Sequence, residues 1–349
     1  MQQRDVLTLW MPDLLHPQRI AEAEEELKKL RLPALQTLLA RADKFPVKPQ
    51  DFYEQASYLF HQAESLPIAV CRALGDDVIS RLDSAEASQY WLCVDPVQMI
   101  PDRDSLVLIP NSELAVTRQE SSALVTSFNE HFAEDGIRLL LGDDTHWYLA
   151  MPQAIRLQTT VIDHVAFKPI NEFYPQGSAA QYWRQLINET QMLFFNHPVN
   201  EQRRLQGMAE INSIWVWGQG QLDTTQVKLR SNAAVYAQQS FFKGMAKICQ
   251  SEFNAVPLNF QNWHKSSQAN EHFFVFDQMS SQLDGLQLLE WVALLQQLEK
   301  DWFAPLLQAL KSGQIKEVLL DIGAQYRYHC QSTHLKRFWR MKKSLHKMH

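Results

Sequence analysis

The chain has 349 residues, is 46% hydrophobic and carries a formal net charge of −6 at pH 7, which allows one large domain or two ordinary ones with a sizeable core. No apolar run approaches the roughly 18 residues of a membrane span, and the N-terminus lacks a secretory signal pattern. Cys71, Cys93, Cys249 and Cys330 show no CxxC spacing, so neither a zinc ribbon nor a disulfide framework is predicted. We expect a cytoplasmic globular protein with no membrane partner. Its net negative charge argues against nucleic-acid binding that depends on a positive electrostatic field over the whole protein.

The N-terminal part predicts the beginning of an α/β domain. VLTLWMP is a short apolar run typical of a buried strand, and the charged segment after it has a helical pattern. After a break at Pro33, Leu35, Leu38 and Leu39 recur at helical spacing and predict a further helix.

From Trp91 onward the pattern predicts short strands and amphipathic helices. WLCVDPVQMI and SLVLIP are apolar runs separated by the turn-forming PDRD, and RQESSALVTSFNEHFAEDG is a helix ended by Gly136. IRLLL and HWYLAMP flank GDDT as a β-hairpin. A helix is expected to start at Ser178, where SAAQ has the capping-box pattern, and SIWVWG is a strand with Trp215 and Trp217 on one side.

The last third returns to alternation of helices and strands. SNAAVYAQQSFFKGMAKIC is read as a helix, HFFVFD as a strand, LQLLEWVALLQQLEKDWFAPLLQAL as a long helix and EVLLDIG as a strand. The predicted fold class is α/β, with one domain formed by residues 1–88 and 226–349 and an inserted α+β domain at 89–225.

One stretch, NHPVNEQRRLQGMAEINSIWVWGQG at 196–220, carries most of the functional signal. It is either a helix terminus with a capping Asn200 or a ligand-facing segment, because Arg presents a planar fork that suits carboxylate or phosphate. Backbone N–H groups of a Gly-rich turn can add anion donors. GQG alone is far short of a dinucleotide fingerprint. The paired Trp215 and Trp217 favour core packing over a stacking platform.

The order of HWYLAM, DHVAF, a helix ending in HPVNEQRRLQG, and INSIWVWGQGQ resembles the inserted domain of archaeal-type cofactor-independent phosphoglycerate mutases. DRDSL at 102–106 is similar to that family's Asp-Arg-Arg turn, with Asp104 in place of the second Arg. The chain is also similar to a family of RpfE-type regulatory proteins in DPV, FNEHF, HPVN and W-x-WG-x-G. The resemblance implies an alkaline-phosphatase-like, catalytic-type domain assembled from both chain ends.

The resemblance also implies a site for a small phosphorylated anion in the inserted domain. We expect His197, Asn200 and Arg203 to meet Arg103 beside the Gly218–Gly220 turn, facing a cleft between the domains. The full set of implied ligand-binding residues is Arg103, His146, His197, Asn200, Arg203, Asn212, Trp217, Gly218 and Gly220.

For catalysis, the resemblance implies a nucleophilic Ser and two divalent metals, Mn or Mg, held by six or seven Asp and His ligands. Ser65 is the nearest match to the nucleophile. The family's His ligands are missing after HFFVFD and after EVLLD, so the carboxylates are interpreted as relics and no cofactor is expected. These relic candidates are Asp13, Asp277, Asp284 and Asp321.

Three functions remain open on this basis. The favoured one is a non-catalytic regulatory or partner-binding protein with a residual anion pocket. The second is a metal-dependent phosphomutase or phosphatase, in which His329 or His334 joins the carboxylates and Ser65. The third is a nucleic-acid-associated accessory protein that uses the tail LKRFWRMKKSLHKMH (335–349), where six Lys or Arg surround two aromatics. The same tail could instead dock an acidic protein partner or be a solvated end.

Overall fold

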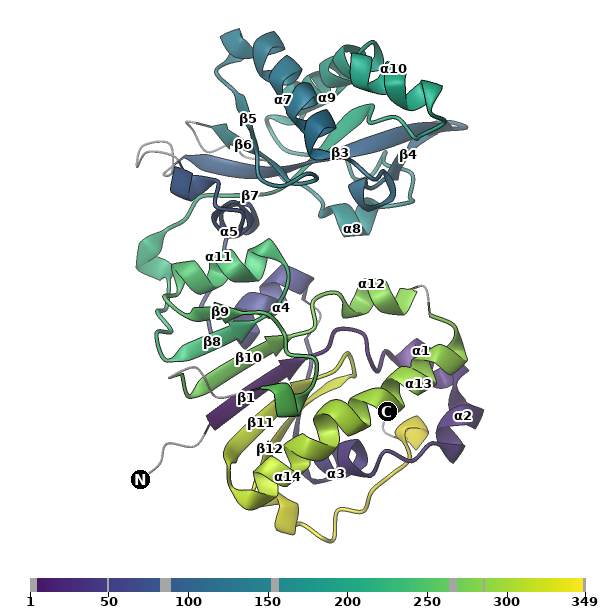
Figure 1. Cartoon of the computed structure of the whole chain (residues 1–349), viewed down its shortest axis with the longest axis vertical. Helices are drawn as coiled ribbons and strands as arrows, with labels where there is room; N and C mark the ends of the chain where they lie inside the picture. Colours follow the sequence, from purple (N-terminus) through teal and green to yellow (C-terminus); the bar gives the residue numbers. More distant parts are fainter. Residues whose placement is uncertain are drawn as a thin grey trace. The chain divides into compact units, whose positions relative to one another are not determined.

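The structure is a computed structural model that describes residues 5–48, 50–81, 89–151, 157–263, 269–284 and 286–347. The chain forms two compact units, which Figure 1 shows in cartoon form. Unit 1 joins Met1–Glu64 to Val227–His349, and unit 2 is the continuous segment Ser65–Gln226. The sequence put the first boundary at 88, whereas residues 65–81 cluster with unit 2. None of the helices in the described ranges is both long and apolar enough to cross a bilayer.

Unit 1 is built on a seven-stranded sheet in the order β2-β12-β11-β1-β10-β8-β9. The strands from β11 to β9 run parallel, and β12 and β2 extend the sheet in antiparallel fashion. The first strand lies in the middle because its two neighbours come from the far end of the chain. The strands are β1 (Asp5–Trp10), β2 (Asp43–Pro46), β8 (Ala233–Tyr236), β9 (Glu252–Asn254), β10 (Glu271–Val275), β11 (Ile315–Asp321) and β12 (Tyr326–Gln331).

Helices cover both faces of this sheet. One face packs an aliphatic core that includes Leu7, Leu9 and Leu320 under α3, α13 and α14 (Figure 1). The other face is aromatic, and Trp10 stacks on Phe52 of α4 at 4.7 Å between ring centroids. The helices are α1 (Pro17–Glu22), α2 (Glu24–Lys29), α3 (Pro33–Arg41), α4 (Phe52–Leu59), α11 (Ser240–Ile248), α12 (Met279–Asp284), α13 (Leu288–Leu298) and α14 (Ala304–Ser312), with a π-helical segment at Glu299–Phe303.

The predicted helix SNAAVYAQQSFFKGMAKIC is wrong over its first half. Ala233–Tyr236 form strand β8, and only Ser240–Ile248 are helical. All four residues of β8 are buried, since the strand lies between β10 and β9. A parallel strand buried on both faces shows no alternation of polar and apolar residues, so periodicity does not separate it from a buried helix.

Unit 2 is an antiparallel sheet in the order β4-β3-β6-β5, with β7 also paired to β3. Helix α9 packs on β7, α7 packs on β5 and α9, and α5 packs on β3 and β7. The elements are α5 (Ile68–Gly75), β3 (Tyr90–Asp102), β4 (Ser105–Ile109), α7 (Arg118–His131), β5 (Arg138–Leu141), β6 (Trp147–Met151), α8 (Ile162–Val165), α9 (Ala180–Phe195), α10 (Pro198–Leu205) and β7 (Ser213–Gly220).

The capping box expected at Ser178 is also wrong. The N-cap of α9 is Ala179, whose side chain makes no capping bond. The helix starts one residue too late for Ser178 to serve. A complete capping box occurs instead at α7, where the Thr117 hydroxyl accepts the N–H of Glu120 and the Glu120 carboxylate accepts the N–H of Thr117.

Candidate functional site

The carboxyl ends of the parallel strands of unit 1 hold two of the predicted relic carboxylates. Asp321 ends β11, and its Oδ2 accepts hydrogen bonds from Arg327 Nε at 2.5 Å and from Gln55 Nε2 at 2.8 Å. Asp277 follows β10, and its Oδ2 accepts the backbone N–H of Gln239 at 2.6 Å. Both are buried, and burial raises the pKa of Asp277. Each carboxylate therefore already satisfies donors of the protein.

Asp13 lies just past β1 in a left-handed conformation, with φ 58°. Its Oδ2 accepts a hydrogen bond from Ser280 Oγ at 2.7 Å. Gly323 is packed so closely that a Cβ there would lie 2.5 Å from the Cα of Asp13. The side chain of Asp284, the fourth relic candidate, lies outside the described part of the chain.

The residues at the carboxyl ends of the parallel strands of unit 1 do not fit a two-metal centre. The Arg327 guanidinium, rather than an imidazole, stands beside Asp321, and a second cation there would be repelled. His329 pairs with Glu317 at 3.0 Å, and His334 lies 3.6 Å from Asp43. Among the described residues, no group with metal-ligand spacing includes Asp13, Asp277 or Asp321.

Ser65, the predicted nucleophile, is exposed at the start of unit 2. It precedes Pro67, the N-cap of α5. No hydrogen bond within the described ranges joins its hydroxyl to a base, so nothing in them activates it as a nucleophile.

In unit 2, the buried Arg203 side chain links three segments of the chain through its hydrogen bonds. Only 1% of it is exposed, and its Nη1 pairs with Glu120 Oε1 at 2.8 Å. Nε donates to the carbonyl of Ala209 at 2.5 Å, and Nη2 donates to the carbonyl of Leu114. All three guanidinium nitrogens are thus bound within unit 2, which gives Arg203 a structural role there.

Asn200 lies on the same face of α10 and is fully buried. Its Nδ2 donates to the carbonyls of Phe194 and Ile211, both at 2.9 Å, and its Oδ1 accepts the N–H of Ile211 at 2.8 Å. The amide therefore fastens the end of α9 to the segment that enters β7.

His197 is the N-cap of α10. Its Nδ1 accepts the backbone N–H of Val199 at 3.2 Å, and its Nε2 lies 2.9 Å from Ser127 Oγ. Because Nδ1 must accept, the ring is neutral with its proton on Nε2, which donates to Ser127. Burial lowers the pKa of His197, in agreement with this arrangement.

This geometry predicts a pH-dependent contribution of His197 to stability. With a folded-state pKa below the unfolded value of about 6.5, the unfolded chain takes up the proton first. The contribution is therefore fully present above pH about 6.5 and is lost as the pH falls through the lower folded-state pKa. Asn caps a helix without titrating. Between pH 7.5 and 5, urea unfolding should show a steeper loss of stability in the wild type than in His197→Asn, and parallel curves would contradict this.

Arg103 does not join these residues at the glycine turn. In the pairing of β3 with β7, Trp91 faces Gly220 and Val97 faces Ser213, so the turn lies at the start of β3. Arg103 follows the last residue of β3 and is 12 residues beyond Trp91, the residue opposite Gly220, which is roughly 40 Å along a strand. The structure therefore does not bring Arg103 to the Gly218–Gly220 turn. Asn212, likewise, bonds to the backbone of Met99.

The two glycines of the G-x-G turn have a packing reason. Gly218 has φ 63°, and a Cβ there would lie 3.1 Å from Ile68 Cβ. A Cβ on Gly220 would lie 2.7 Å from Pro67 Cβ. Helix α5 approaches the backbone of β7 at this point, and only glycine leaves the space.

Trp217 and His146 belong to two neighbouring polar clusters of unit 2 that the sequence did not reveal. Trp217 Nε1 donates to Asp95 Oδ2 at 2.6 Å, and the Arg72 guanidinium lies 4.8 Å from the Trp217 ring while pairing with Asp95 Oδ1 at 3.3 Å. All three side chains are buried. Nearby on β6, the Tyr148 hydroxyl donates to Asp76 Oδ2 at 2.5 Å.

His146 extends the cluster of Tyr148 and Asp76 to the surface of unit 2. Its Nδ1 lies 3.2 Å from Asp76 Oδ2 and 3.0 Å from Asp143 Oδ2. One ligand atom from each of the three residues lies within 4.8 Å of the others, which is a spacing that could hold a metal ion. The other oxygen of Asp143 accepts the N–H groups of Thr145 and His146. Asp-x-x-His in GDDTH was the available signal in the sequence.

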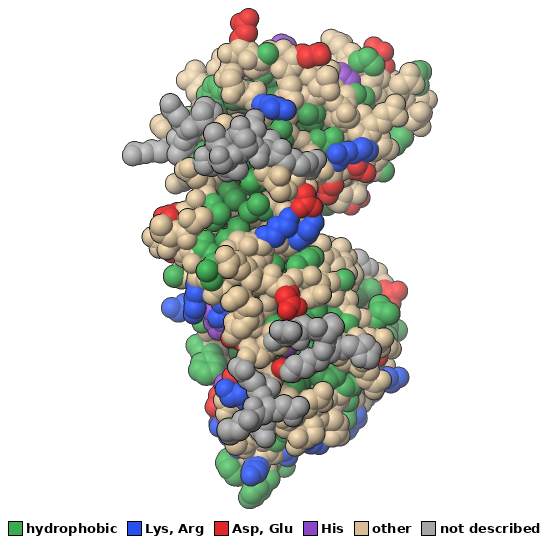
Figure 2. Space-filling view, turned by 60° about the vertical axis from the view of Figure 1, so that its left-hand side comes forward, with side chains coloured by type: hydrophobic (Ala, Val, Ile, Leu, Met, Phe, Trp, Pro, Cys, Tyr) green, Lys and Arg blue, Asp and Glu red, His purple; other side chains and the backbone are tan. Residues whose placement is uncertain are grey.

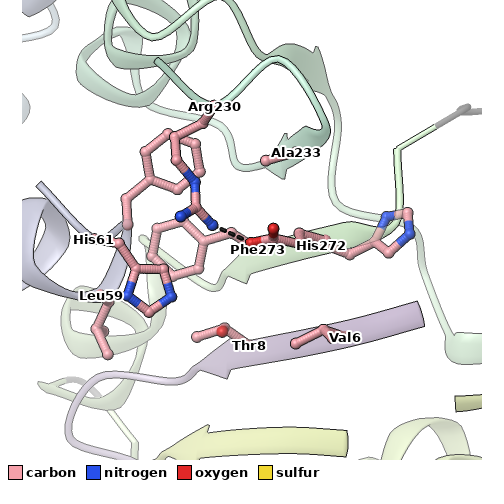
Figure 3. Close-up of a pocket in the computed structure, with 10 residues that line it drawn as sticks. Val6, Thr8, Leu59, His61, Arg230, Ala233, His272 and Phe273 are labelled. Atoms are coloured by element: carbon pink, nitrogen blue, oxygen red, sulfur yellow. Dashed lines mark hydrogen bonds and ion pairs between the residues drawn. The ribbon is translucent and has the colours of Figure 1, made fainter. Parts of the chain in front are cut away.

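A small pocket in unit 1 lies at the amino ends of β1 and β10 (Figure 3). Figure 3 shows Arg230 and His61 turned toward each other above Thr8, and Arg230 pairs with the carboxylate of Glu271. The volume is about 20 Å³, which is room for about one water molecule. This pocket is too small for an organic ligand.

The described part of the basic tail, 335–347, packs on unit 1. Arg337 Nη1 pairs with Asp43 Oδ1 at 2.5 Å, and Arg340 Nη1 donates to the carbonyl of Ala42 at 2.6 Å. Leu345 is buried. On the face seen in Figure 2, Lys and Arg are interspersed with Asp and Glu. Some of the basic side chains of the tail therefore bind groups of unit 1 rather than a partner. The last two residues, 348 and 349, lie outside the described ranges.

Comparison with known proteins agrees with this fold. No protein family model matches the chain. A probable 2,3-bisphosphoglycerate-independent phosphoglycerate mutase of Geobacter sulfurreducens is 27% identical over 128 residues, which are 36% of this chain and 32% of the relative. The corresponding mutase of Methanosarcina mazei is 25% identical over 107 residues, 30% of this chain and 27% of the relative. The chain thus spans about a third of the length of these curated relatives.

Two solved structures show the same architecture over nearly the whole chain. The cofactor-independent phosphoglycerate mutase of Thermoplasma acidophilum superposes with a TM-score of 0.53 at 11% identity, covering 98% of this chain and 94% of that one. A protein of Pyrococcus horikoshii gives 0.57 at 13% identity, covering 94% and 86%. The chain therefore has the alkaline-phosphatase-like fold of a cofactor-independent phosphoglycerate mutase, as predicted. These matches give no support to the resemblance to RpfE-type proteins.

Proposed function

We propose that this protein is a non-catalytic relative of the phosphoglycerate mutases that acts by binding rather than by phosphoryl transfer. The observation that carries the proposal is the pairing of Asp321 with Arg327 and Gln55 at the end of β11. A phosphoryl-transfer site of this class needs metal cations beside its carboxylates. Here the protein supplies a permanent cation of its own, because an arginine side chain stays protonated.

The chemistry of the fold supports the same conclusion. A serine hydroxyl is a weak nucleophile until a base or a metal removes its proton. Ser65 is exposed and has no such neighbour in the described ranges. Loss of nucleophile activation and loss of charge stabilisation each raise the activation free energy. Every increase of 1.4 kcal/mol slows the reaction about tenfold.

The test is an activity assay with added metal. Purified protein with Mn²⁺ or Mg²⁺ should neither interconvert 3- and 2-phosphoglycerate nor hydrolyse p-nitrophenyl phosphate above the background of a mock purification. Metal-dependent turnover that disappears in both Ser65→Ala and Asp321→Asn would overturn the proposal. Turnover that both variants retain comes either from a contaminant or from the Asp76–Asp143–His146 group; loss of that turnover in His146→Ala would assign it to this chain and also overturn the proposal.

A metal-dependent phosphatase is the second candidate, and the group Asp76, Asp143 and His146 favours it. One imidazole and two carboxylates suit a first-row divalent cation, but a single three-ligand group is short of a dimetal site. If this candidate is right, Mn²⁺ should raise the melting temperature of the wild type and not of His146→Ala. Phosphatase activity should then depend on His146 and not on Ser65.

A further inference from the structure

An open cavity of about 490 Å³ lies in unit 1. The end of α4 and the loop after it form one wall, and strands β2, β11 and β12 form the other. This half of the sheet is its antiparallel edge. The volume is in the range of small-molecule sites, roughly 300–1,000 Å³. The side chains that matter are Phe45, Tyr58, His61, Lys228, Leu319 and Arg327.

Arg327 is the buried cation of this cavity. It is only 6% exposed, and its Nε is bound to Asp321. Its guanidinium carbon lies 4.6 Å from the centre of the Tyr58 ring. The buried Nη2 has no hydrogen-bond partner among the described residues. Because an unpaired buried donor on a charged group is unfavourable, an acceptor that reached this nitrogen would be stabilised by it.

A second cation stands at the cavity where solvent reaches it. Lys228 is exposed, and its ammonium forms no ion pair within the described ranges. Its backbone is fixed by Gln62, which donates to the Lys228 carbonyl at 3.0 Å and accepts the Lys228 N–H at 2.9 Å. Asp321 is bound to Arg327, and Glu271 is bound to Arg230 in the neighbouring small pocket (Figure 3). The lining itself has no acidic residue.

The remaining walls are apolar and aromatic. Phe45 is 52% exposed and Tyr58 is 54% exposed, although both line the cavity. Leu319 contributes the floor from β11. When an apolar ligand surface covers a half-exposed aromatic side chain, the burial lowers the free energy of the complex. The cavity therefore has apolar and aromatic walls beside the exposed ammonium of Lys228 and the guanidinium of Arg327, which is paired with Asp321.

We propose that this cavity binds a small organic anion. Its carboxylate or phosphate would accept from Arg327 Nη2 and attract Lys228, and its apolar or aromatic body would pack between Phe45 and Tyr58. The inference uses the same Arg327 side chain as the proposed function, but binding of an anion in the cavity does not require the absence of catalysis. The adjacent pocket of Figure 3 is a separate, much smaller space in which Arg230 pairs with Glu271.

Isothermal titration calorimetry tests the proposal with four probes: phenyl phosphate, benzoate, inorganic phosphate and benzyl alcohol. We expect saturable binding of phenyl phosphate or benzoate, and whichever binds more tightly identifies the anionic group. Inorganic phosphate should bind at least about tenfold more weakly than phenyl phosphate, because it lacks the apolar body. Benzyl alcohol, which has no charge, should not bind measurably.

Variants assign the binding to this cavity. Lys228→Met and Tyr58→Ala should each weaken the binding of phenyl phosphate by about three- to tenfold, since one removes a charge and the other an aromatic wall. Arg327→Lys should weaken it further by removing the fork. Lys311→Met, an exposed lysine in the last turn of α14, is the matched control and should leave the affinity unchanged.

Three results would overturn the proposal. The first is no binding of either aromatic anion at millimolar concentration. The second is equal affinity for inorganic phosphate and phenyl phosphate. The third is binding that Lys228→Met and Tyr58→Ala leave intact. Because Lys228 and Tyr58 are exposed, both variants should fold, and circular dichroism checks this, so the conclusion stands even if Arg327→Lys is unstable.

Discussion

Replacing Arg203 by Ala should lower the free energy of unfolding by about 3–5 kcal/mol. The side chain is 1% exposed, and its loss would leave Glu120 without its cation. The carbonyls of Leu114 and Ala209 would lose their donor at the same time. Buried acceptors that lose a charged partner cost much more than the net value of the hydrogen bond. Urea unfolding measured by far-UV circular dichroism gives the value.

The neighbouring residue supplies the control for this experiment. Arg204 also pairs with an acid, Glu210, at 2.7 Å, but its side chain is 40% exposed. Arg204→Ala should therefore cost less than about 1 kcal/mol. Equal effects of the two substitutions would mean that Arg203 is not a buried structural residue. A fully stable Arg203→Ala would return the residue to the ligand role that the sequence suggested.

The second large effect is expected at Gly323, which follows β11. Gly323 has φ 72°, and an added Cβ would meet the backbone of Asp13 at 2.5 Å. A left-handed conformation costs an L-residue about 1–2 kcal/mol, and forced overpacking adds about 1–3 kcal/mol. Gly323→Ala should thus destabilise the protein by about 2–5 kcal/mol in the same unfolding assay.

Gly136 separates the two contributions. Its φ is 68°, but nothing lies within 4 Å of an added Cβ. Gly136→Ala should therefore show only the conformational cost, about 1–2 kcal/mol. If the two glycine variants lost the same stability, the close approach of Asp13 to Gly323 would have no energetic weight.

Much of the fold follows from local patterns in the sequence. The hairpin of β5 and β6 was predicted because IRLLL and HWYLAM flank a polar turn, and the structure confirms it. Strands β1, β10 and β11 were predicted as well, since each is a short apolar run. Strand β8 was missed because a fully buried strand does not alternate polar and apolar residues, so its sequence lacks the pattern that predicts a strand.

The site was harder to predict because its contacts are distant in the chain. Asp76 and His146 are 70 residues apart in the sequence, and no local sequence pattern predicts that they pair. The motif HPVNEQRR was recognised, but the burial of Asn200 and Arg203 was not predicted. Asn200 and Arg203 are three residues apart and share one helix face. That spacing could have indicated that both are buried, as the structure shows.

The central position of β1 has a consequence for biosynthesis. Its partner strands begin at Glu271 and Ile315, so about 260 residues follow Trp10 before the first of them emerges. At roughly 5–20 residues per second, the nascent chain waits on the order of ten seconds to a minute with this apolar strand unpaired. The continuous segment Ser65–Gln226 is completed within that interval. A ribosome-bound chain should therefore hold unit 2 folded while β1 is still available to chaperones.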